Sequence, residues 1–248
     1  MEGTAQNKVL LSFVILMLWD VAVAFDVRPL GMQLRPDGNK LAGDIEIFNP
    51  TSEALPVEIS VHQLELDPNN RSPRRGRLAE DELMVFPPAA LIGSGEAQSV
   101  RVQWLGAEDA IEQARSYLIV IEQLPVNDDD GEEGVQMVLT FNAVVHVANT
   151  SFAPELSAEL LPDTPDQQNR ETPVNRVNIR NDGNGIAFGE SLSLEIVNRE
   201  GDTMIVGPEQ LDAESGEIFI PPRSSQIVHV IADGIFREVV TVLPLYER

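Results

Sequence analysis

The residues that could do chemistry in this chain are few, and their types and spacing do not form a catalytic site. The histidines, His62, His146 and His229, each fall within an alternating strand pattern, where a single histidine is usually a surface or edge residue. No G-x-S-x-G, H-E-x-x-H or phosphate-loop motif occurs, and the Gly183-Asn184-Gly185 turn lacks the lysine and helix of a phosphate cradle. Cysteine is absent, which excludes disulfides, thiolate metal sites and a cysteine nucleophile. We therefore expect a protein that is not an enzyme and has no cofactor.

Two charged segments are candidates for binding sites. In residues 128–133, DDDGEE, the acids are contiguous and no glutamate follows at the distance a calcium loop requires, so we expect a solvated loop and no metal site. Residues 71–77, RSPRRGR, form the one basic patch, which predicts the loop of a hairpin, with contact to an acidic partner as the open alternative. The chain has 17 Lys and Arg against 40 Asp and Glu, a net charge of -23, which excludes nucleic-acid binding through charge neutralisation.

The N-terminal segment predicts export. Residues 9–19, VLLSFVILMLW, are apolar except for Ser12 and too short to span a bilayer, which takes roughly 20 residues. Lys8 precedes this run, and the small-x-small pattern of residues 22–24, AVA, follows it. We expect a signal peptide over residues 1–24, cleaved after Ala24, and no membrane span after cleavage. An uncleaved membrane anchor is the alternative, and the charge of Asp20 argues against it.

The rest of the chain is dominated by strands with period-2 alternation. Apolar residues alternate with polar ones in several runs, among them Val57, Ile59 and Val61; Val100, Val102 and Trp104; Val177 and Ile179; and Leu192, Leu194 and Ile196. Residues 116–124, SYLIVIEQL, are apolar on both faces in their middle, as in the central strand of a sandwich. Only residues 106–114, GAEDAIEQA, look helical. Many short strands separated by turn signals predict antiparallel sandwiches.

The spacing of the strands predicts an all-β fold of two immunoglobulin-like β-sandwich domains. We expect an N-terminal domain over residues 25–150 and a C-terminal β-sandwich domain over residues 151–248, with the hinge near residues 149–154. Residues 157–173 contain three prolines and a polar run, so they are either a linker or a long loop early in the second domain.

Residues 135–147, VQMVLTFNAVVHV, form an unusually long alternating run. Apolar side chains occupy one face throughout: Val135, Met137, Leu139, Phe141, Ala143, Val145 and Val147. Strands usually have about 5–6 residues, so this one is long. One interpretation is a core strand of the first sandwich. The other is that part of the row faces a groove left open for another chain, since strand addition is a known mode of recognition and an unused open edge invites aggregation.

Three segments of the first half resemble the periplasmic chaperones of the chaperone–usher pilus pathway, and are most similar to the archaic, Csu-type branch. Residues 86–102, FPPAALIGSGEAQSVRV, are similar to the family's Pro-Pro, apolar, Gly and V-R-V stretch. Residues 116–126, SYLIVIEQLPV, are similar to its S-Y-x-apolar run ending in Leu-Pro, and residues 135–147 take the place of its donor strand. Asn49-Pro50-Thr51 also matches an Asn-containing turn of the family. The resemblance covers residues 25–150; over residues 155–248 only general β patterning and the N-x-G-N-G turn agree.

The resemblance implies a periplasmic chaperone with its domains in a boomerang arrangement. Such a chaperone binds pilus or fimbrial subunits by donor-strand complementation and delivers them to an outer-membrane usher. The implied donor strand consists of Val135, Met137, Leu139, Phe141 and Ala143. Self-association of the free protein through the open strand is a further expectation.

In the family, an Arg of the first strand and a Lys of the donor strand bind the carboxylate at the subunit's C-terminus. Gln33 and Val144 fall at those places, so Arg28 or Arg35 is the candidate substitute, because Arg suits carboxylate recognition. The acid that forms an inter-domain ion pair in other members falls at Gln123, unless Glu122 replaces it.

An exported structural or adhesive protein of a surface fibre is the alternative function. A protein that binds carbohydrate in this way would require paired aromatic residues in a groove. Trp104 and Tyr117 are too few to indicate such a groove. A hydrolase lacks a candidate nucleophile and base.

Overall fold

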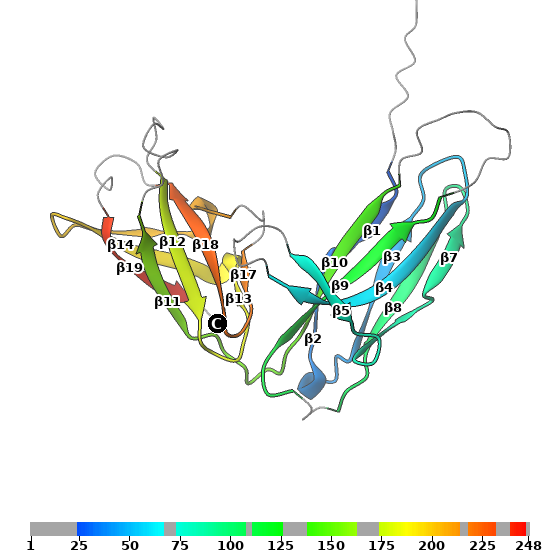
Figure 1. Ribbon diagram of the computed structural model, residues 1–248, viewed down its shortest axis with the longest axis horizontal. Coiled ribbons are helices and arrows are strands. Elements are labelled where there is room, and N and C mark those ends of the chain that lie inside the picture. Colours follow the sequence, from blue (N-terminus) through cyan, green and yellow to red (C-terminus); the bar gives the residue numbers. More distant parts are fainter. Residues whose placement is uncertain are drawn as a thin grey trace, which may run out of the picture.

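The computed structural model describes residues 24–66, 73–107, 111–125, 138–162, 174–213, 218–231 and 239–246. These residues form strands, turns and short 3-10 helices, and contain no α-helix. They lie in two β lobes that meet at an angle (Figure 1). The predicted all-β fold of two sandwich domains is confirmed. No helix in the described part of the chain is long and apolar enough to cross a membrane, and residues 1–23 of the predicted signal peptide lie outside it.

The first lobe, the N-terminal domain, is a sandwich of two sheets. One sheet has the strand order β1-β3-β8-β6, and the other has the order β2-β10-β9-β4-β5, with β7 also paired to β4. The strands are β1 (Asp26–Arg28), β2 (Gly31–Leu34), β3 (Ala42–Phe48), β4 (Leu55–Glu65), β5 (Arg74–Leu78), β6 (Leu83–Phe86), β7 (Ala89–Ile92), β8 (Ala97–Trp104), β9 (Arg115–Gln123) and β10 (Thr140–Val147). A 3-10 turn, η1 (Pro36–Gly38), lies between β2 and β3.

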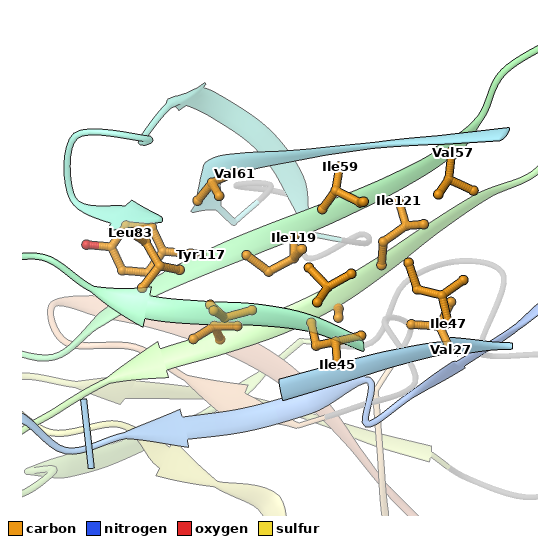
Figure 2. Packing of buried hydrophobic residues seen from close by; sticks show 14 of the residues in the cluster. Val27, Ile45, Ile47, Val57, Ile59, Val61, Leu83, Tyr117, Ile119 and Ile121 are labelled. Atoms are coloured by element: carbon orange, nitrogen blue, oxygen red, sulfur yellow. The ribbon is translucent and has the colours of Figure 1, made fainter. Parts of the chain in front are cut away.

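The core of the N-terminal domain follows from the alternation in the sequence. In Figure 2, Val57, Ile59 and Val61 of β4 point into the core from the same sheet as β9, and the side chains of β3 face them from the opposite sheet. All three are buried, as are Val100, Val102 and Trp104 of β8. β9 lies between β10 and β4, and Leu118, Ile119, Val120 and Ile121 are buried on both of its faces. The prediction of a central strand there is confirmed.

The second lobe, the C-terminal domain, has a separate core. Its sheets have the orders β11-β12-β18-β16, β15-β14-β19 and β13-β17. The elements are β11 (Leu156–Leu161), β12 (Val174–Asn181), β13 (Ala187–Phe188), η2 (Gly189–Ser191), β14 (Leu192–Asn198), β15 (Thr203–Val206), η3 (Pro208–Gln210), β16 (Leu211–Asp212), β17 (Phe219–Ile220), β18 (Ser224–Ile231) and β19 (Val239–Tyr246). The alternating residues Val177, Ile179, Leu192, Leu194 and Ile196 are all buried in this core.

The predicted helix over residues 106–114 is wrong in the part that the structure describes. Residues 106–107 and 111–114 have no helical hydrogen bonding, and residues 108–110 lie outside the description. Tertiary contacts replace the local preference here. Ile111 packs into the N-terminal core, and the backbone N–H of Ala114 donates to the carbonyl oxygen of Asn184, 2.8 Å away in the C-terminal domain.

A buried asparagine organises one end of each sandwich. Asn49 Nδ2 donates to the carbonyl oxygens of Glu53 at 2.7 Å, Ile92 at 3.0 Å and Gly93 at 3.1 Å. In the C-terminal domain, Asn181 Nδ2 donates in the same manner to carbonyl oxygens of that domain. The two asparagines open the Asn-Pro-Thr and Asn-Asp-Gly turns, so these turn signals also mark the points where loops are held to the sheets.

We expect Asn49→Ala to lower the free energy of unfolding of the N-terminal domain by about 2–4 kcal/mol. The substitution leaves buried carbonyl oxygens without a donor, and each costs about 1–3 kcal/mol. Trp104 is buried in that domain, so its fluorescence during urea unfolding measures the effect. Asn142→Ala, on the exposed side of β10, is the matched control, expected to change stability by less than about 0.5 kcal/mol. Equal unfolding midpoints for the two variants would contradict the role given to Asn49.

Candidate functional site

The start of the N-terminal domain crosses from one sheet to the other and leaves part of β10 uncovered. β1 pairs with β3, whereas β2 pairs with β10 in the parallel sense, from Gly31 opposite Val144 to Leu34 opposite Val147. β9 lies along the other side of β10 for its full length. Residues 140–143 therefore have a strand on one side only, within the described part of the chain. This open edge presents backbone N–H and C=O groups to which a further strand can bind.

The apolar row predicted for a partner lies at this open edge. Leu139 and Phe141 are half-buried and pack against the rim of the N-terminal core, and Ala143 is buried on the same face. Val135 and Met137 lie outside the described residues. The strand was predicted to begin at Val135; among the described residues β10 begins at Thr140, and the backbone N–H of Gln123 on β9 also donates to the carbonyl oxygen of Leu139 at 2.9 Å. Neither Leu139 nor Phe141 is sealed within the protein's own interior.

Phe25 supports this row from within the protein. Its ring is only 3% exposed, and the centroids of the Phe25 and Phe141 rings are 4.6 Å apart with the planes tilted by 58°. Sequence reasoning did not single out Phe25 as a functional residue; its position next to the predicted cleavage site is the only signal. The contact holds Phe141 at the edge with one side of its ring covered.

A cavity of about 1070 Å³ lies between the two domains. Residues of β2 and β10 line its N-terminal wall, among them Gln33, Val144 and His146, together with Arg35 just after β2. The C-terminal domain supplies the opposite wall, which includes Phe188. The cavity therefore adjoins β10, the strand that also carries the open edge at residues 140–143.

The structure separates the two candidate anchors for a carboxylate. Arg35 is exposed in the cavity wall, and its Nη2 donates to Gln33 Oε1 at 3.0 Å. Arg28, by contrast, does not line the cavity, and its side chain is 80% exposed and pairs with Asp26 at 2.7 Å. Gln33 lies opposite His146 in the ladder and Val144 lies opposite Gly31. Arg35 and Gln33 are thus brought together at the cavity, and Arg28 lies apart from them.

Arginines of the basic patch, residues 71–77, form ion pairs within the N-terminal domain. Arg75 pairs with Glu122 at 3.5 Å, so Glu122 bonds within the N-terminal domain instead of bridging to the other. Arg77 pairs with Glu82 of the same domain. Arg71 lies outside the described residues.

Glu82 is a second polar centre that sequence reasoning missed. Arg115 Nη1 and the Tyr117 hydroxyl both donate to Glu82 Oε2 at 2.6 Å. Burial acts to raise the pKa of Glu82, but the hydrogen bonds from Tyr117 and Arg115 outweigh it and hold the pKa below its ordinary value. Glu82 thus stays ionised and ties the turn between β5 and β6 to β9.

The contacts at the hinge and between the two domains include both polar and apolar groups. Asp37 Oδ2 accepts hydrogen bonds from Thr150 N and Oγ1, both at 2.6 Å, which fixes the η1 turn to the connecting segment. His146 was expected to lie at the surface, but it is only 7% exposed, because the C-terminal domain covers it. No motif signals this burial. Among the described residues, no group of three His, Asp or Glu side chains is placed to hold a metal ion, and residues 128–133 lie outside the description.

No family model matches the chain, and no curated protein matches its sequence. Solved structures do match in fold. The class 5 fimbriae chaperone CfaA has a TM-score of 0.53 at 14% identity over 91% of this chain and 99% of its own. A chain of the CsuC–CsuE chaperone–tip adhesion subunit pre-assembly complex, from archaic chaperone-usher Csu pili of Acinetobacter baumannii, has a TM-score of 0.54 at 12% identity over 90% of this chain and 98% of its own.

A chain of the Salmonella enterica SafA pilin in complex with the SafB chaperone has a TM-score of 0.53 at 9% identity, covering 90% of this chain and 96% of its own. These matches extend over both domains, although the sequence showed a specific resemblance only in the first. The protein therefore has the two-domain β-sandwich fold of the chaperones of chaperone–usher pili.

Proposed function

We propose that this protein is a non-enzymatic periplasmic chaperone that holds pilus or fimbrial subunits by donor-strand complementation and delivers them to an outer-membrane usher. The observation that carries the proposal is the open edge of β10, where residues 140–143 have a partner strand on one side only and Leu139 and Phe141 are half-buried. A sandwich that lacks one strand can complete its sheet at such an edge.

The proposed binding combines backbone and side-chain contributions. Ladder hydrogen bonds to residues 140–143 fix the register of the client strand, and the half-buried side chains of Leu139 and Phe141 meet the client's open core, whereas Ala143 is buried in the protein's own core. Val135 and Met137 are proposed to extend this row. Burial of each large side chain contributes about 1.5–3 kcal/mol, from which the cost of ordering both partners is subtracted.

The proposed anchor is Arg35, assisted by Gln33, in the cavity between the domains. A terminal carboxylate of the client can accept hydrogen bonds from the exposed guanidinium, which already lies within hydrogen-bonding distance of Gln33. Arg28 does not line this cavity, so it is not part of the proposed anchor.

The class of partner follows from the sequence motifs and is supported by the names of the structural neighbours. The Csu and Saf neighbours are named as complexes of a chaperone with a tip subunit or a pilin. The predicted signal peptide supports the periplasm as the compartment. In the absence of a client, a second copy of the chain is the proposed cover for the open edge.

The adhesive alternative receives no support from the aromatic residues that it would need. Trp104 and Tyr117 are 3% and 0% exposed, and both pack in the N-terminal core, so they cannot form a platform for a ligand.

Co-expression with a fimbrial subunit that lacks its final strand tests the proposal. We expect a stable one-to-one complex by size-exclusion chromatography with light scattering, and a subunit that aggregates when the chaperone is omitted. A subunit that stays soluble alone, or that never co-elutes with this protein, would count against a chaperone function.

A further inference from the structure

The imidazole of His146 joins the two domains. His146 lies on β10, and its ring centroid is 5.2 Å from that of Phe188 on β13 and 5.2 Å from that of Phe219 on β17. The interplanar angles are 75° and 61°, so both aromatic contacts are edge-to-face. A side chain of one domain is thus held between two rings of the other.

Apolar residues surround this joint. Ala114, Ala148, Ile186 and Phe219 form a buried cluster drawn from both domains, against which Phe188 and other partly buried side chains pack. Ser116 on β9 is the hydrogen-bond partner of His146, with 2.9 Å between Oγ and Nδ1. The joint is therefore apolar apart from one neutral hydroxyl, and it forms part of the wall of the cavity between the domains.

The charged groups on the elements packed around His146 are turned to other partners or to solvent. On β9, Arg115 bonds to Glu82. Beyond β2, Arg35 bonds to Gln33, which is the ladder partner of His146. On β4, His62 bonds to Ser60 and to the backbone of Gly76. In the C-terminal domain, Glu190 follows Phe188 and is exposed. Within the described part of the chain, no carboxylate forms an ion pair with His146.

We propose that His146 is the positioning residue that fixes the orientation of the two domains, and that its neutral imidazole is required for this, so that the joint loosens in acid. The role of His146 in domain orientation does not depend on the proposed function. Only the consequence for client binding rests on that function.

The direction of the pH effect follows from which state of the joint, closed or opened, binds the proton more tightly at His146. Burial lowers the pKa of His146 to about 4, whereas a histidine exposed by an opened joint has an ordinary pKa of about 6.5. Between these values the opened state binds the proton and the closed state does not. Each unit of acidification in that range therefore favours the opened state by up to about tenfold.

The absence of cysteine allows the domain orientation to be measured directly. Ser99 on β8 and Thr241 on β19 are exposed, one in each domain, and are changed to Cys and spin-labelled. Electron–electron double resonance on the protein alone is expected to give a narrow distance distribution at pH 7.5 and a broadened one at pH 5. Trp104 fluorescence verifies that the N-terminal domain stays folded at both values.

The variants separate titration from mere packing. His146→Phe keeps an aromatic ring that cannot titrate, and is expected to give a narrow distribution at both pH values. Phe188→Ala is expected to broaden it at pH 7.5, and His229→Phe, on β18, to behave as the wild type. An unchanged wild-type distribution, or equal broadening in His146→Phe on acidification, overturns the proposal. If His146→Phe does not fold, His146→Gln replaces it, and its distribution is expected to be the same at pH 7.5 and pH 5, whatever its width.

Client binding is a second, separate measurement. We expect the affinity for a subunit to fall at least fivefold between pH 7.5 and pH 5 in the wild type and to stay level in His146→Phe. Failure of the subunit to bind at any pH would contradict the proposed function and leave the distance measurement to decide the role of His146.

Discussion

Leu139→Glu is expected to abolish the one-to-one complex between this protein and a fimbrial subunit. Leu139 packs at the rim of the N-terminal core beside the open edge of β10, where a client's core is proposed to meet it. The substitution replaces an apolar contact worth about 1.5–3 kcal/mol with a charge that burial in the client would leave unpaired, at a further cost of several kcal/mol. Size-exclusion chromatography and calorimetry with a purified subunit measure the loss.

Thr140→Glu is the matched control for this prediction. Thr140 is the next residue along the chain, is exposed, and points to the opposite face of the sheet, so the same charge there is expected to leave the complex intact. The double variant with Phe141→Glu should also lose binding, but Phe141 contacts Phe25, so the single variant Leu139→Glu disturbs the protein's own fold less. Normal binding by Leu139→Glu would rule out this row as the donor strand.

Arg35→Ala is expected to weaken subunit binding by about 10- to 100-fold. A hydrogen bond to a charged group contributes about 1.5–3 kcal/mol, and every 1.4 kcal/mol is about a factor of ten in affinity. Arg35 is exposed in the cavity between the domains, so its removal should not change the stability of the free protein. Isothermal titration with a subunit that has a free C-terminus measures the loss.

Arg28→Ala is the control for charge alone. It removes the same charge from the N-terminal domain at a residue that does not line the cavity, so subunit affinity is expected to change by less than about threefold. A subunit whose C-terminal carboxylate is amidated should bind Arg35→Ala and the wild type equally. Equal losses for the two arginine variants would show that Arg35 acts through general electrostatics and not as an anchor.

β10 links the two parts of the proposed site, which are the apolar row at the open edge and the anchor in the cavity between the domains. β10 carries the apolar row at its start and His146 near its end, so one strand is proposed both to contact the client and to fix the orientation of the C-terminal domain. A change in the domain angle therefore moves the cavity wall relative to the donor row. For this reason we expect the anchor at Arg35 and the row at Leu139 to act cooperatively in binding.

Local pattern was enough to predict the class of fold and the residues of the core. The period-2 alternation of Val57, Ile59 and Val61 requires one buried face, and the double-sided apolar run of residues 116–124 requires a central strand; both are as predicted. The Asn-Pro-Thr and Asn-Asp-Gly turns were recognised for the same reason, because a turn depends on neighbouring residues only. The apolar row of residues 135–147 was also visible as a face, of which the structure describes residues 138–147.

Contacts between distant segments decided the rest. The sequence left Arg28 and Arg35 equivalent, since nothing local reveals that the chain changes sheets between β1 and β2 and so carries only Arg35 to the cavity. The described residues of the predicted helix, 106–107 and 111–114, are not helical. Ile111 packs into the N-terminal core instead, and Ala114 donates a hydrogen bond to the other domain. His146 is buried by Phe188 and Phe219, which lie far from it in the sequence. Alternation specifies which face of a strand is apolar, whereas the partner that covers that face is set by how the sheets and domains pack.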